Sequence, residues 1–352
     1  MLPELFPEGW VVRGGMTNFI EKTRNMRAYN WGILGTGNIA HKFARALMLL
    51  DNANLYAVGS RDAARAEQFA AEFGFSKHFG TYEEMLADPG VEVVYISSPH
   101  SHQLEHTLLA LPNGKHVICE KPMSITAAEV SVMIDEARKN NLFLMEALWP
   151  PFQPSYLKAD EILKGGKLGR LHHIRGKFAF VSPYHPELRT YNLSLGGGAL
   201  LDIGIYPIMD ILRYMGEPES VTAASVLAPT GADESTAMIF RFSDGRMAEA
   251  YCSFGNMGGV STEFNCENGN LILTRGRDRN QHLMIELPGD TDDRIFTPPA
   301  QGYQYEAAEV MNCLDHGMTE SPVVPLSFSL TLARILDEVR RKAGIKYPGR
   351  DR

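Results

Sequence analysis

The sequence predicts an α/β protein with two domains: an N-terminal doubly wound parallel sheet of the Rossmann type, and a C-terminal α+β domain with a large, mostly antiparallel open sheet. Three observations lead to this prediction. Short apolar runs alternate with stretches of helical period across residues 29–147, which is typical of βαβ units. Prolines then interrupt the chain within residues 150–154, as expected at a domain boundary. Beyond them, strand-like runs meet at Asp-Gly (244–245) and Asn-Gly (268–269), dipeptides that favour hairpin turns.

Length and composition limit the class of protein. The chain has 352 residues and a mass of 39.1 kDa, which at roughly 100–200 residues per domain suggests two domains. Lysine and arginine number 34 and aspartate and glutamate 42, so the formal net charge is 34 − 42 = −8, which argues against a nucleic-acid partner.

No stretch approaches the ~18 apolar residues that span a bilayer, so we expect no membrane partner. Four widely spaced cysteines indicate reduced thiols, and no secretory signal is visible, so we expect a cytoplasmic protein.

The first 148 residues divide into an arm and a domain. Residues 1–28 contain several prolines and glycines and no clear period. We interpret them as an N-terminal arm, either a remnant of start-site choice or an ordered segment that packs on a partner subunit. The first domain, residues 29–148, alternates strands and helices. We expect strands at 29–35, 54–60, 77–80, 91–98, 115–120 and 142–147, and helices at 38–50, 62–74, from Thr81, at 102–114 and at 126–141. Asp62 and Gly74 are expected to cap the second of these helices.

The second domain, residues 149–352, has a different pattern. We expect helices at 156–164, 196–216 and 329–344, a strand at 172–182, and hairpins over 235–254 and 260–275. Few helices are available to cover one face of this sheet, and an exposed apolar sheet face usually finds a partner. We therefore expect a homodimer or a dimer of dimers joined sheet to sheet.

A glycine-rich motif follows the first strand and opens the first helix. Gly35-Thr36-Gly37-Asn38-Ile39 and the alanine after them read G-x-G-x-x-A. The first glycine permits a tight turn, the second lets the backbone approach a pyrophosphate, and the small third residue lets helix and strand pack closely. Free N–H groups at the helix N-terminus then bind phosphate. Because further βα units follow, the motif indicates a dinucleotide site rather than an ordinary turn.

The end of the second strand discriminates between the two dinucleotides. An NAD-binding site usually places a carboxylate there, to bind the ribose 2′-hydroxyl. Here Ser60 and Arg61 occupy that position, 60 − 35 = 25 residues after the first glycine, and Asp62 lies one residue beyond it as the expected helix cap. Arg61 and Arg65 can pair with a 2′-phosphate while Ser60 donates a hydrogen bond. This pattern favours NADP over NAD, unless both arginines simply form a solvated helix face.

Four motifs together resemble one oxidoreductase family. CEKP, WGILGTGNIA, ISSPHSHQLEHTLLAL and GGGALLDIGIYPIMD are similar to motifs of the glucose-fructose oxidoreductase, inositol dehydrogenase and rhizopine-catabolism oxidoreductases. The resemblance covers roughly residues 29–343. It is nearest to NADP-dependent xylose dehydrogenases and dimeric trans-dihydrodiol dehydrogenases, through the Ser60-Arg61 dipeptide, the run MEALW and a tyrosine at 206. It implies a dehydrogenase that transfers a hydride between the nicotinamide and a carbon-bound hydroxyl of a sugar or cyclic polyol, of the aldose or dihydrodiol type.

The resemblance, together with the chemistry, indicates three catalytic residues. Hydride transfer from an alcohol carbon needs a group that takes the hydroxyl proton. Tyr206 is the candidate, and the Lys121 ammonium would favour its phenolate. Asp202 precedes Tyr206 by four residues, on the same face of a helix, and would orient the substrate. The alternatives are a core tyrosine and a carboxylate at the start of a helix. Asp210, four residues further on, is interpreted as structural.

The resemblance also assigns residues around the cofactor and the substrate. It implies that Ser98, Pro99, His102 and Glu120 line the cofactor with Lys121, and that the peptide bond before Pro122 is cis. The histidines at 100, 102 and 106 lack a completing Cys or carboxylate cluster, so no metal is expected.

Aromatic residues mark the expected start of the substrate cleft. Trp149 and Phe152 would cover the apolar sides of a ring substrate or, as an equal alternative, pack between hydrophobic elements. The near relatives usually read Thr-Arg after MEALW, whereas this chain has Pro150-Pro151. A basic residue is therefore absent from the expected cleft edge, which leaves the identity of the substrate open.

Two other functions remain as alternatives to a releasing dehydrogenase. One is a non-catalytic protein of the same fold that senses NADP, although such a protein should have lost Lys121 or Tyr206, and both are present. The other is an oxidoreductase with a tightly held, internally recycled cofactor, clasped by the arm of residues 1–28.

Overall fold

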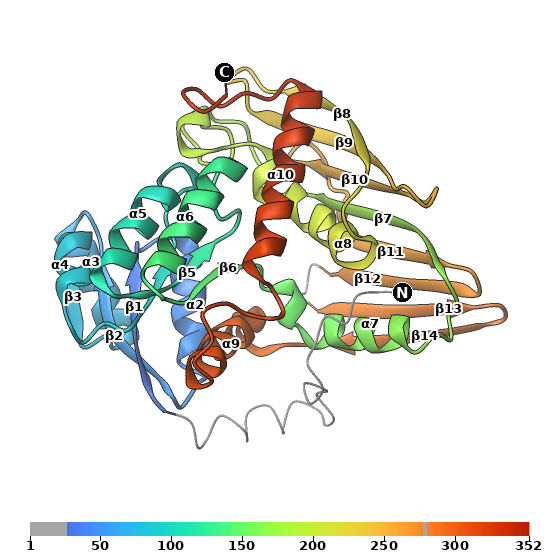
Figure 1. Ribbon diagram of the computed structural model, residues 1–352. Coiled ribbons are helices and arrows are strands. Elements are labelled where there is room, and N and C mark those ends of the chain that lie inside the picture. Colours follow the sequence, from blue (N-terminus) through green and yellow to red (C-terminus); the bar gives the residue numbers. More distant parts are fainter. Residues whose placement is uncertain (1–26, 277–279, 352) are drawn as a thin grey trace. The chain divides into compact units, whose positions relative to one another are not determined.

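The computed structural model describes residues 27–276 and 280–351 and divides into two units (Figure 1). Of the described residues, unit 1 takes those up to Ser124, Ala128–Gln153 and Pro299–Ser329. Unit 2 takes Ile125–Ala127, Pro154–Pro298 and the residues from Leu330 onward. Each unit is thus assembled from separate stretches of the chain. The predicted arm, residues 1–28, lies outside the described residues except for its last two.

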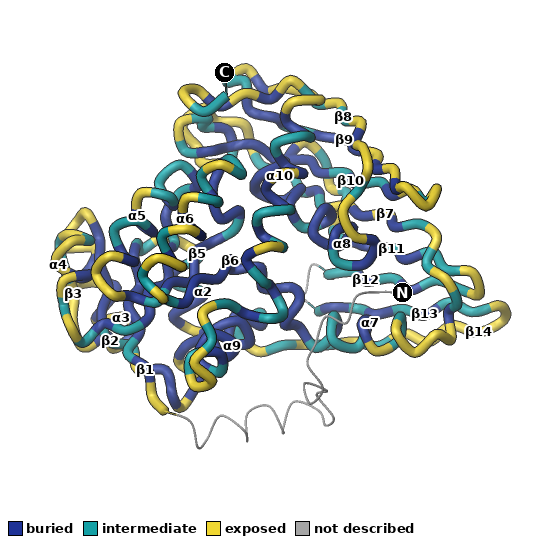
Figure 2. The backbone as a smooth tube through the Cα atoms, viewed as in Figure 1, coloured by how far each residue is buried: buried dark blue, intermediate teal, exposed yellow. Residues whose placement is uncertain are grey.

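Unit 1 is built on a six-stranded parallel sheet with the strand order β3-β2-β1-β4-β5-β6. The order reverses between β1 and β4, and ligands of open α/β sheets bind at such a switch point, outside the carboxyl ends of the strands. The central strands are rich in Val and Ile, and all four residues of β4 are buried. The neighbouring strands β5 and β6 are also largely buried, and the tube is dark blue beside their labels in Figure 2. The strands are β1 (Tyr29–Leu34), β2 (Ala53–Gly59), β3 (Lys77–Phe79), β4 (Val93–Ile96), β5 (His116–Glu120) and β6 (Leu144–Ala147).

Helices connect these strands and cover the sheet. They are α2 (Asn38–Leu47), α3 (Ala63–Phe73), α4 (Tyr82–Ala87), α5 (Gln103–Ala110) and α6 (Ala127–Lys139). Asp62 accepts a hydrogen bond from the Arg65 N–H and Gly74 has φ 76°, so both predicted caps of α3 are confirmed. A further helix, α9 (Tyr303–Asp315), comes from much later in the chain and packs against α2 (Figure 1).

Unit 2 is built on an eight-stranded sheet with the order β14-β13-β12-β11-β7-β10-β9-β8. Every neighbouring pair is antiparallel except β7 and β10, which are parallel. The predicted fold class is therefore confirmed for both sheets. The strands are β7 (Leu171–Ala179), β8 (Ser220–Leu227), β9 (Asp233–Arg241), β10 (Met247–Ser253), β11 (Gly259–Cys266), β12 (Gly269–Arg275), β13 (Gln281–Leu287) and β14 (Asp290–Phe296).

In the described part of the chain, helices contact one face of this sheet and leave the other exposed. Helix α7 (Pro154–Lys164) contacts β13, and α8 (Ile205–Met215) contacts β7 and β10. Helix α10 (Leu326–Ala343) belongs to unit 2 from Leu330 onward. In β9 the residues alternate between buried, such as Met238 and Phe240, and exposed, such as Ile239. This period of two places the apolar core between sheet and helices.

The hairpins agree only in part with the sequence prediction. Gly245 has φ 84° and donates to the Phe242 carbonyl, as expected at the predicted Asp-Gly turn between β9 and β10. The predicted Asn-Gly turn at 268–269 is displaced by one residue, because Gly269 already pairs with Cys266. The two residues that connect β11 and β12 are therefore Glu267 and Asn268.

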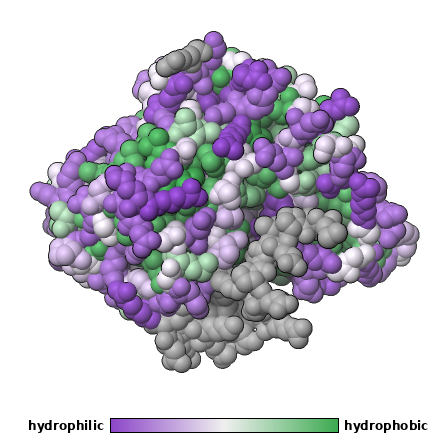
Figure 3. Space-filling view, in the orientation of Figure 1, coloured by the Kyte–Doolittle hydropathy of each residue, from purple (hydrophilic) through white to green (hydrophobic). Residues whose placement is uncertain are grey.

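One helical stretch of the described residues, Leu193–Met215, is long and apolar enough to cross a membrane. Its most apolar window is 89% buried inside the protein, which is what a core helix requires. This stretch is more apolar than the sequence analysis recognised. On the side shown in Figure 3, the described hydrophobic residues form separate patches among hydrophilic ones.

Candidate active site

The glycine-rich loop after β1 leaves the start of α2 open. Gly35 has φ +102°, and a Cβ there would lie 2.7 Å from the Ser97 hydroxyl, so this turn needs glycine. Gly37 precedes α2 without any side-chain cap, and a Cβ built on it meets nothing within 4 Å. The first N–H groups of α2 are thus available to an anion, with open space in front of them. Thr36, Asn38 and Ile39 complete this loop.

The end of β2 carries the residues predicted to select the cofactor. Ser60 is buried, and its hydroxyl accepts a hydrogen bond from the Asp62 N–H at 3.2 Å. Arg61 lies beside Tyr82: burial raises the pKa of Tyr82, and the guanidinium opposes that rise. Arg65 makes a 3.5 Å ion pair with Asp62, and both side chains are exposed. Asp62 caps the helix, as predicted, so its carboxylate is hydrogen-bonded to the N-terminus of α3.

Polar side chains of the loop after β4 and of α5 lie together. The Ser98 hydroxyl lies 2.9 Å from His106 Nδ1, and the His106 ring stacks 5.9 Å from that of His102. Burial lowers the pKa of His106 to about 4, so the ring is neutral at pH 7. Pro99 precedes the short turn that presents His102. Across residues 27–276 and 280–351, no group of three or more His, Cys, Asp or Glu side chains is arranged to hold a metal ion.

Two buried carboxylates hold the turn that carries Lys121. Glu120 Oε2 accepts a hydrogen bond from the Lys121 N–H at 3.1 Å, and its other oxygen accepts one from Tyr95. Two residues later, the Met123 N–H donates to Glu146 Oε1 at 2.8 Å. The peptide bond between Lys121 and Pro122 is cis, as the family resemblance implied. The backbone is therefore fixed on both sides of Lys121.

The carboxyl group of Glu146 titrates near neutrality. Burial raises its pKa to about 7; the positive charge of Lys121 opposes this rise and the negative charge of Glu120 adds to it. A second buried acid, Glu306 on α9, has its pKa raised well above the usual value by burial and by Glu120. The sequence analysis missed both. The run MEALW was noted only as a family trait, and Glu306 lies in a helix that was not predicted.

The aromatic residues after β6 are packed within unit 1. The Trp149 ring lies 5.7 Å from that of Tyr303, and Phe152 is also buried. Gln153 donates a hydrogen bond to the Gly302 carbonyl at 3.0 Å and so ties this segment to the start of α9. These contacts agree with the packing alternative for both aromatic residues.

Asp202 and Tyr206 lie in unit 2, where a glycine-rich turn leads into α8. Residues Leu200–Gly204 form a π-helical turn, which α8 continues. The i, i+4 spacing of the two residues therefore spans a π turn, which closes between residues i and i+5, and not a regular α-helical turn. The shared face of the two side chains stays a prediction. Tyr206 is half-buried, with its ring 5.6 Å from that of Phe178.

Arg189 is the partner of Asp202. Its Nη2 donates to both carboxylate oxygens, at 3.1 and 3.0 Å. The Asp202 side chain is only 10% exposed, whereas that of Arg189 is 46% exposed. Sequence analysis missed Arg189, because it lies in an irregular segment with no periodicity and no motif.

The remaining acid of this helix is structural, as predicted. Asp210 accepts hydrogen bonds from Tyr156 at 3.2 Å and from Thr262 at 2.5 Å. Burial raises its pKa to about 7.

The predicted residues thus fall into two groups. Unit 1 holds the glycine-rich loop, the residues at the end of β2, the loop after β4 and Lys121. Unit 2 holds Tyr206 and Asp202, and Arg189 of the same unit is paired with Asp202. The first group can bind an anionic dinucleotide beside a lysine, and the second offers a carboxylate and a phenol.

Comparisons with known proteins agree with this chemistry. Residues 29–148 match a family model described as an oxidoreductase family with an NAD-binding Rossmann fold, and residues 156–272 match the GFO/IDH/MocA C-terminal domain. Trans-1,2-dihydrobenzene-1,2-diol dehydrogenase of Mus musculus is 36% identical over 338 residues, which cover 91% of this chain and 98% of that protein. The Homo sapiens protein of the same name is 36% identical over 336 residues, with the same coverage of both chains.

Solved structures show the same fold. Levoglucosan dehydrogenase in complex with NADH and levoglucosan superposes with a TM-score of 0.82 at 20% identity, covering 90% of this chain and 97% of that one. A 3-ketoreductase from Actinomadura kijaniata, in complex with NADP and TDP-benzene, has a TM-score of 0.81 at 24% identity, covering 90% of this chain and 98% of that one. The predictions of the family and of a dehydrogenase enzyme are confirmed. The chain belongs to the GFO/IDH/MocA family of oxidoreductases, with an N-terminal NAD(P)-binding Rossmann fold and the C-terminal domain of that family.

Proposed function

We propose that this protein is an NADP-dependent dehydrogenase that oxidises a hydroxyl-bearing carbon of a sugar, a cyclic polyol or a trans-dihydrodiol. The observation that carries the proposal is the Lys121 turn, which Glu120 and Glu146 fix at the carboxyl end of β5. A lysine whose backbone is held in this way, in the unit that also contains an open phosphate loop, supports a role in proton handling beside a bound nicotinamide. The names of the relatives in mouse and human support the dihydrodiol class.

The residues of unit 1 fit NADP. Gly35, Thr36, Gly37, Asn38 and Ile39 would hold the pyrophosphate, because the helix N-terminus is uncapped and the space before it is open. Ser60, Arg61 and Arg65 would hold the 2′-phosphate. Ser98, Pro99, His102, Glu120 and Lys121 would line the nicotinamide side. When bound, NADP⁺ supplies the hydride acceptor.

The protein groups supply proton transfer and orientation. Tyr206, as phenolate, takes the proton of the substrate hydroxyl while the C–H hydrogen leaves as hydride. The Lys121 ammonium favours the phenolate and donates to the substrate oxygen. Asp202 accepts a hydrogen bond from the neighbouring hydroxyl, and Arg189 holds that carboxylate in place. Trp149 and Phe152 are proposed to border the apolar side of the ring.

The test of this chemistry is a pair of single variants and their combination. We expect Lys121→Ala and Tyr206→Phe each to lower kcat by at least ~100-fold, the usual scale for general acid–base catalysis. The double variant should be little worse than the worse single one, because groups that act as a unit are not additive. The variants should still bind NADP⁺ in a fluorescence titration. Wild-type kcat in Tyr206→Phe, with an unchanged pH profile, would exclude Tyr206 as the base.

The cofactor preference rests on Arg61. We expect kcat/KM with NADP⁺ to exceed that with NAD⁺, and Arg61→Ala to remove roughly 1.5–3 kcal/mol of the difference by loss of one charged hydrogen-bonded pair. Lys77→Ala is the matched control, since Lys77 is an exposed cation of the neighbouring strand β3, paired with Asp88 at 2.6 Å. Equal use of both cofactors by the wild type would contradict the proposal.

The substrate is best identified by a panel. Aldoses, inositols and dihydrodiols are tested with NADP⁺ at alkaline pH, and formation of NADPH is followed by its absorbance. The absorbance of the purified protein, measured first, shows whether the cofactor is released or tightly held. No turnover of any member of the panel by a protein that binds NADP⁺ would favour a sensor.

We further propose a homodimer, or a dimer of dimers, formed through the uncovered face of the eight-stranded sheet. This face exposes Ile239 (45%), Met247 (44%) and Ile295 (60%), and apolar sheet surface of this kind favours association. An ion pair of 3.1 Å between Arg175 and Glu249 lies on exposed side chains of the same sheet. A monomer by light scattering at micromolar concentration would contradict this.

All four cysteines are free thiols, which supports the expected cytoplasmic location.

A further inference from the structure

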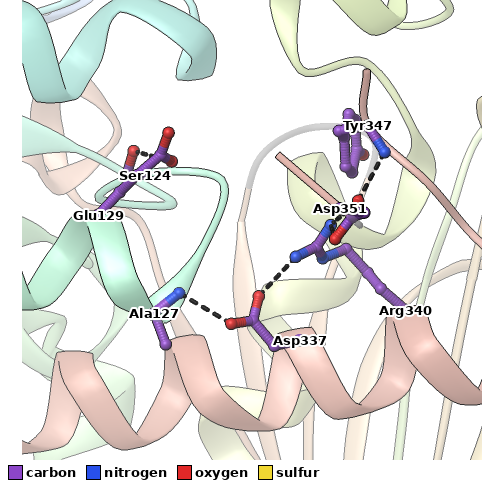
Figure 4. A network of polar contacts seen from close by, with 7 residues as sticks. All are labelled: Ser124, Ala127, Glu129, Asp337, Arg340, Tyr347 and Asp351. Atoms are coloured by element: carbon purple, nitrogen blue, oxygen red, sulfur yellow. Dashed lines mark hydrogen bonds and ion pairs between the residues drawn. The ribbon is translucent and has the colours of Figure 1, made fainter. Parts of the chain in front are cut away.

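A buried arginine organises the segment that follows α10. Arg340 is 2% exposed, and its guanidinium donates to Asp337 Oδ1 at 2.6 Å and to both oxygens of Asp351, at 2.9 and 2.7 Å (Figure 4). Asp337 Oδ2 accepts a hydrogen bond from the Ala127 N–H at 2.9 Å. A buried guanidinium needs carboxylate partners to offset its desolvation, and Arg340 has two. Arg340 therefore fixes Asp351 against α10.

Asp351 in turn fixes Tyr347. Its Oδ2 accepts a hydrogen bond from the Tyr347 N–H at 2.6 Å, and the Arg340 guanidinium lies 5.3 Å from the centre of the Tyr347 ring. The tyrosine is 1% exposed, so its hydroxyl needs a partner inside unit 2. That partner is the carbonyl of Gly197, at 2.8 Å.

The Gly197 carbonyl belongs to a tightly closed turn. A Cβ on Gly197 would lie 2.6 Å from the Arg189 carbonyl and 2.8 Å from the Asn192 nitrogen. The next residue, Gly198, donates to the Thr190 carbonyl at 2.9 Å. The turn thus packs closely beside the Arg189 carbonyl and is hydrogen-bonded to the next residue, Thr190.

The same turn continues into Asp202. The Asp202 N–H donates to the Gly198 carbonyl at 3.2 Å, and its carboxylate receives Arg189 Nη2. The Tyr347 hydroxyl also lies 3.0 Å from the position that a Cβ on Gly198 would take. Tyr347 therefore contacts the turn at Gly197 and Gly198, and the Gly198 carbonyl accepts the Asp202 N–H. Burial is the main cause of the raised pKa of Tyr347; the charges of Asp233, Asp351 and Asp202 add to the rise, and that of Arg340 opposes it.

We infer that Tyr347 is a positioning residue for substrate binding: its hydroxyl, fixed by Arg340 and Asp351, holds the turn that sets the Arg189–Asp202 pair. The inference rests on the proposed role of Asp202 in orienting the substrate. It adds the segment Tyr347–Asp351, which lies outside the four motifs of the family resemblance, to the determinants of substrate affinity. The hydroxyl acts through Gly197 and touches neither substrate nor cofactor.

The test uses Tyr347→Phe, which removes only the hydroxyl. We expect KM for the substrate found in the panel to rise at least tenfold, kcat to change less than threefold, and the Kd for NADP⁺ to stay within twofold. Hydrogen–deuterium exchange of peptides spanning residues 189–203 should accelerate, which requires no substrate. Asp351→Asn, which loosens Tyr347 without removing its hydroxyl, should shift both measurements in the same direction by a smaller amount.

Two controls separate this inference from a general loss of stability and from the proposed function. Tyr29→Phe removes a hydroxyl bonded to Asp315 at 2.7 Å in unit 1; it should lower Tm and leave the substrate KM unchanged. Asp202→Asn should raise the substrate KM. Unchanged exchange in Tyr347→Phe, or faster exchange with wild-type KM while Asp202→Asn is impaired, overturns the inference. A wild-type KM in Asp202→Asn instead shows that the proposed role of Asp202 is wrong, and the inference falls with it.

Discussion

Two glycine-rich turns lead into helices of this protein, and they are built for opposite purposes. The turn of residues 35–37 leads into α2, whose first N–H groups have no side-chain cap, and a Cβ on Gly37 would meet nothing within 4 Å. The turn of residues 196–198 leads into the π turn and α8. There a Cβ on Gly198 would lie 2.2 Å from Asp233 Oδ1, and Asp233 Oδ2 already accepts the Leu200 N–H at 2.7 Å.

The difference shows that glycine before a helix has two separate physical meanings. At Gly37 in the first turn, glycine keeps space empty, so that backbone N–H groups remain available for phosphate. In the second, glycine allows protein atoms to approach, and a buried acid satisfies the helix N-terminus. The first turn is a binding element and the second a packing element that sets Asp202 and Tyr206. Substitutions in the two turns should therefore fail in different ways.

The largest effect is expected from Gly198→Ala. Gly198 has φ +133°, which an L side chain rarely adopts, and the new methyl would overlap the Asp233 carboxylate. Backbone strain and overpacking, each about 1–3 kcal/mol, together predict a loss of roughly 2–6 kcal/mol in the free energy of unfolding. Urea denaturation measures it. Gly216→Ala is the control, because Gly216 also has positive φ but has nothing within 4 Å; an equal loss there would remove the packing explanation.

A smaller, pH-dependent effect is expected from Asp233→Asn. Burial raises the pKa of Asp233 from 3.8 to about 7. Between about pH 4 and pH 7 the native state therefore binds a proton that the unfolded state does not, and the free energy of unfolding falls as pH rises. Asparagine has no such titration, so the variant should show a shallower fall over this window. Asp210 has a similar pKa and remains, so part of the slope should persist; a slope equal to that of the wild type would contradict the raised pKa.

The smallest effect on stability is expected from Gly37→Ala. Gly37 has φ −80°, which alanine adopts, and its Cβ position is open. The free energy of unfolding should change by no more than about 0.5 kcal/mol, whereas the Kd for NADP⁺ should rise at least tenfold, because the methyl group takes space that the pyrophosphate requires. Calorimetric titration measures the latter. Folded Gly198→Ala protein should retain the wild-type Kd for NADP⁺. Weaker NADP⁺ binding by that variant would contradict the proposed difference between the two turns.

The strand and helix order of residues 29–147 followed from sequence because each element there carries its own local signal. A hydrophobic period of 3.6 residues in the helices and runs of Val and Ile in the strands can be recognised in the sequence without knowledge of tertiary contacts. Helix α9 was missed because Glu306 and Glu309 look like solvent-facing residues, yet both are buried. Strand β14 was missed because its residues, DTDDRIF, are mostly polar and exposed at the sheet edge.

The site was predictable only where a motif marks it. The glycine-rich loop, the Ser60-Arg61 dipeptide and the E-K-P motif have spacings that the chain displays directly. Arg189 reaches Asp202 from an irregular segment, and Glu146 reaches the Met123 N–H from the neighbouring strand. Both partnerships arise from tertiary folding, so no local pattern could indicate them.

The position of α9 affects how unit 1 can form during translation and how domains can be exchanged in a chimeric protein. Unit 1 includes Pro299–Ser329, where Asp315 accepts the Tyr29 hydroxyl at 2.7 Å and Glu306 is wholly buried. A nascent chain released up to residue 298 would contain every strand of both sheets, yet its Rossmann half would still lack a covering helix. That half cannot be completed ahead of the rest during translation. A chimera that joins another C-terminal half after residue 153 must therefore bring residues 299–329 along with it, or leave the cofactor domain open.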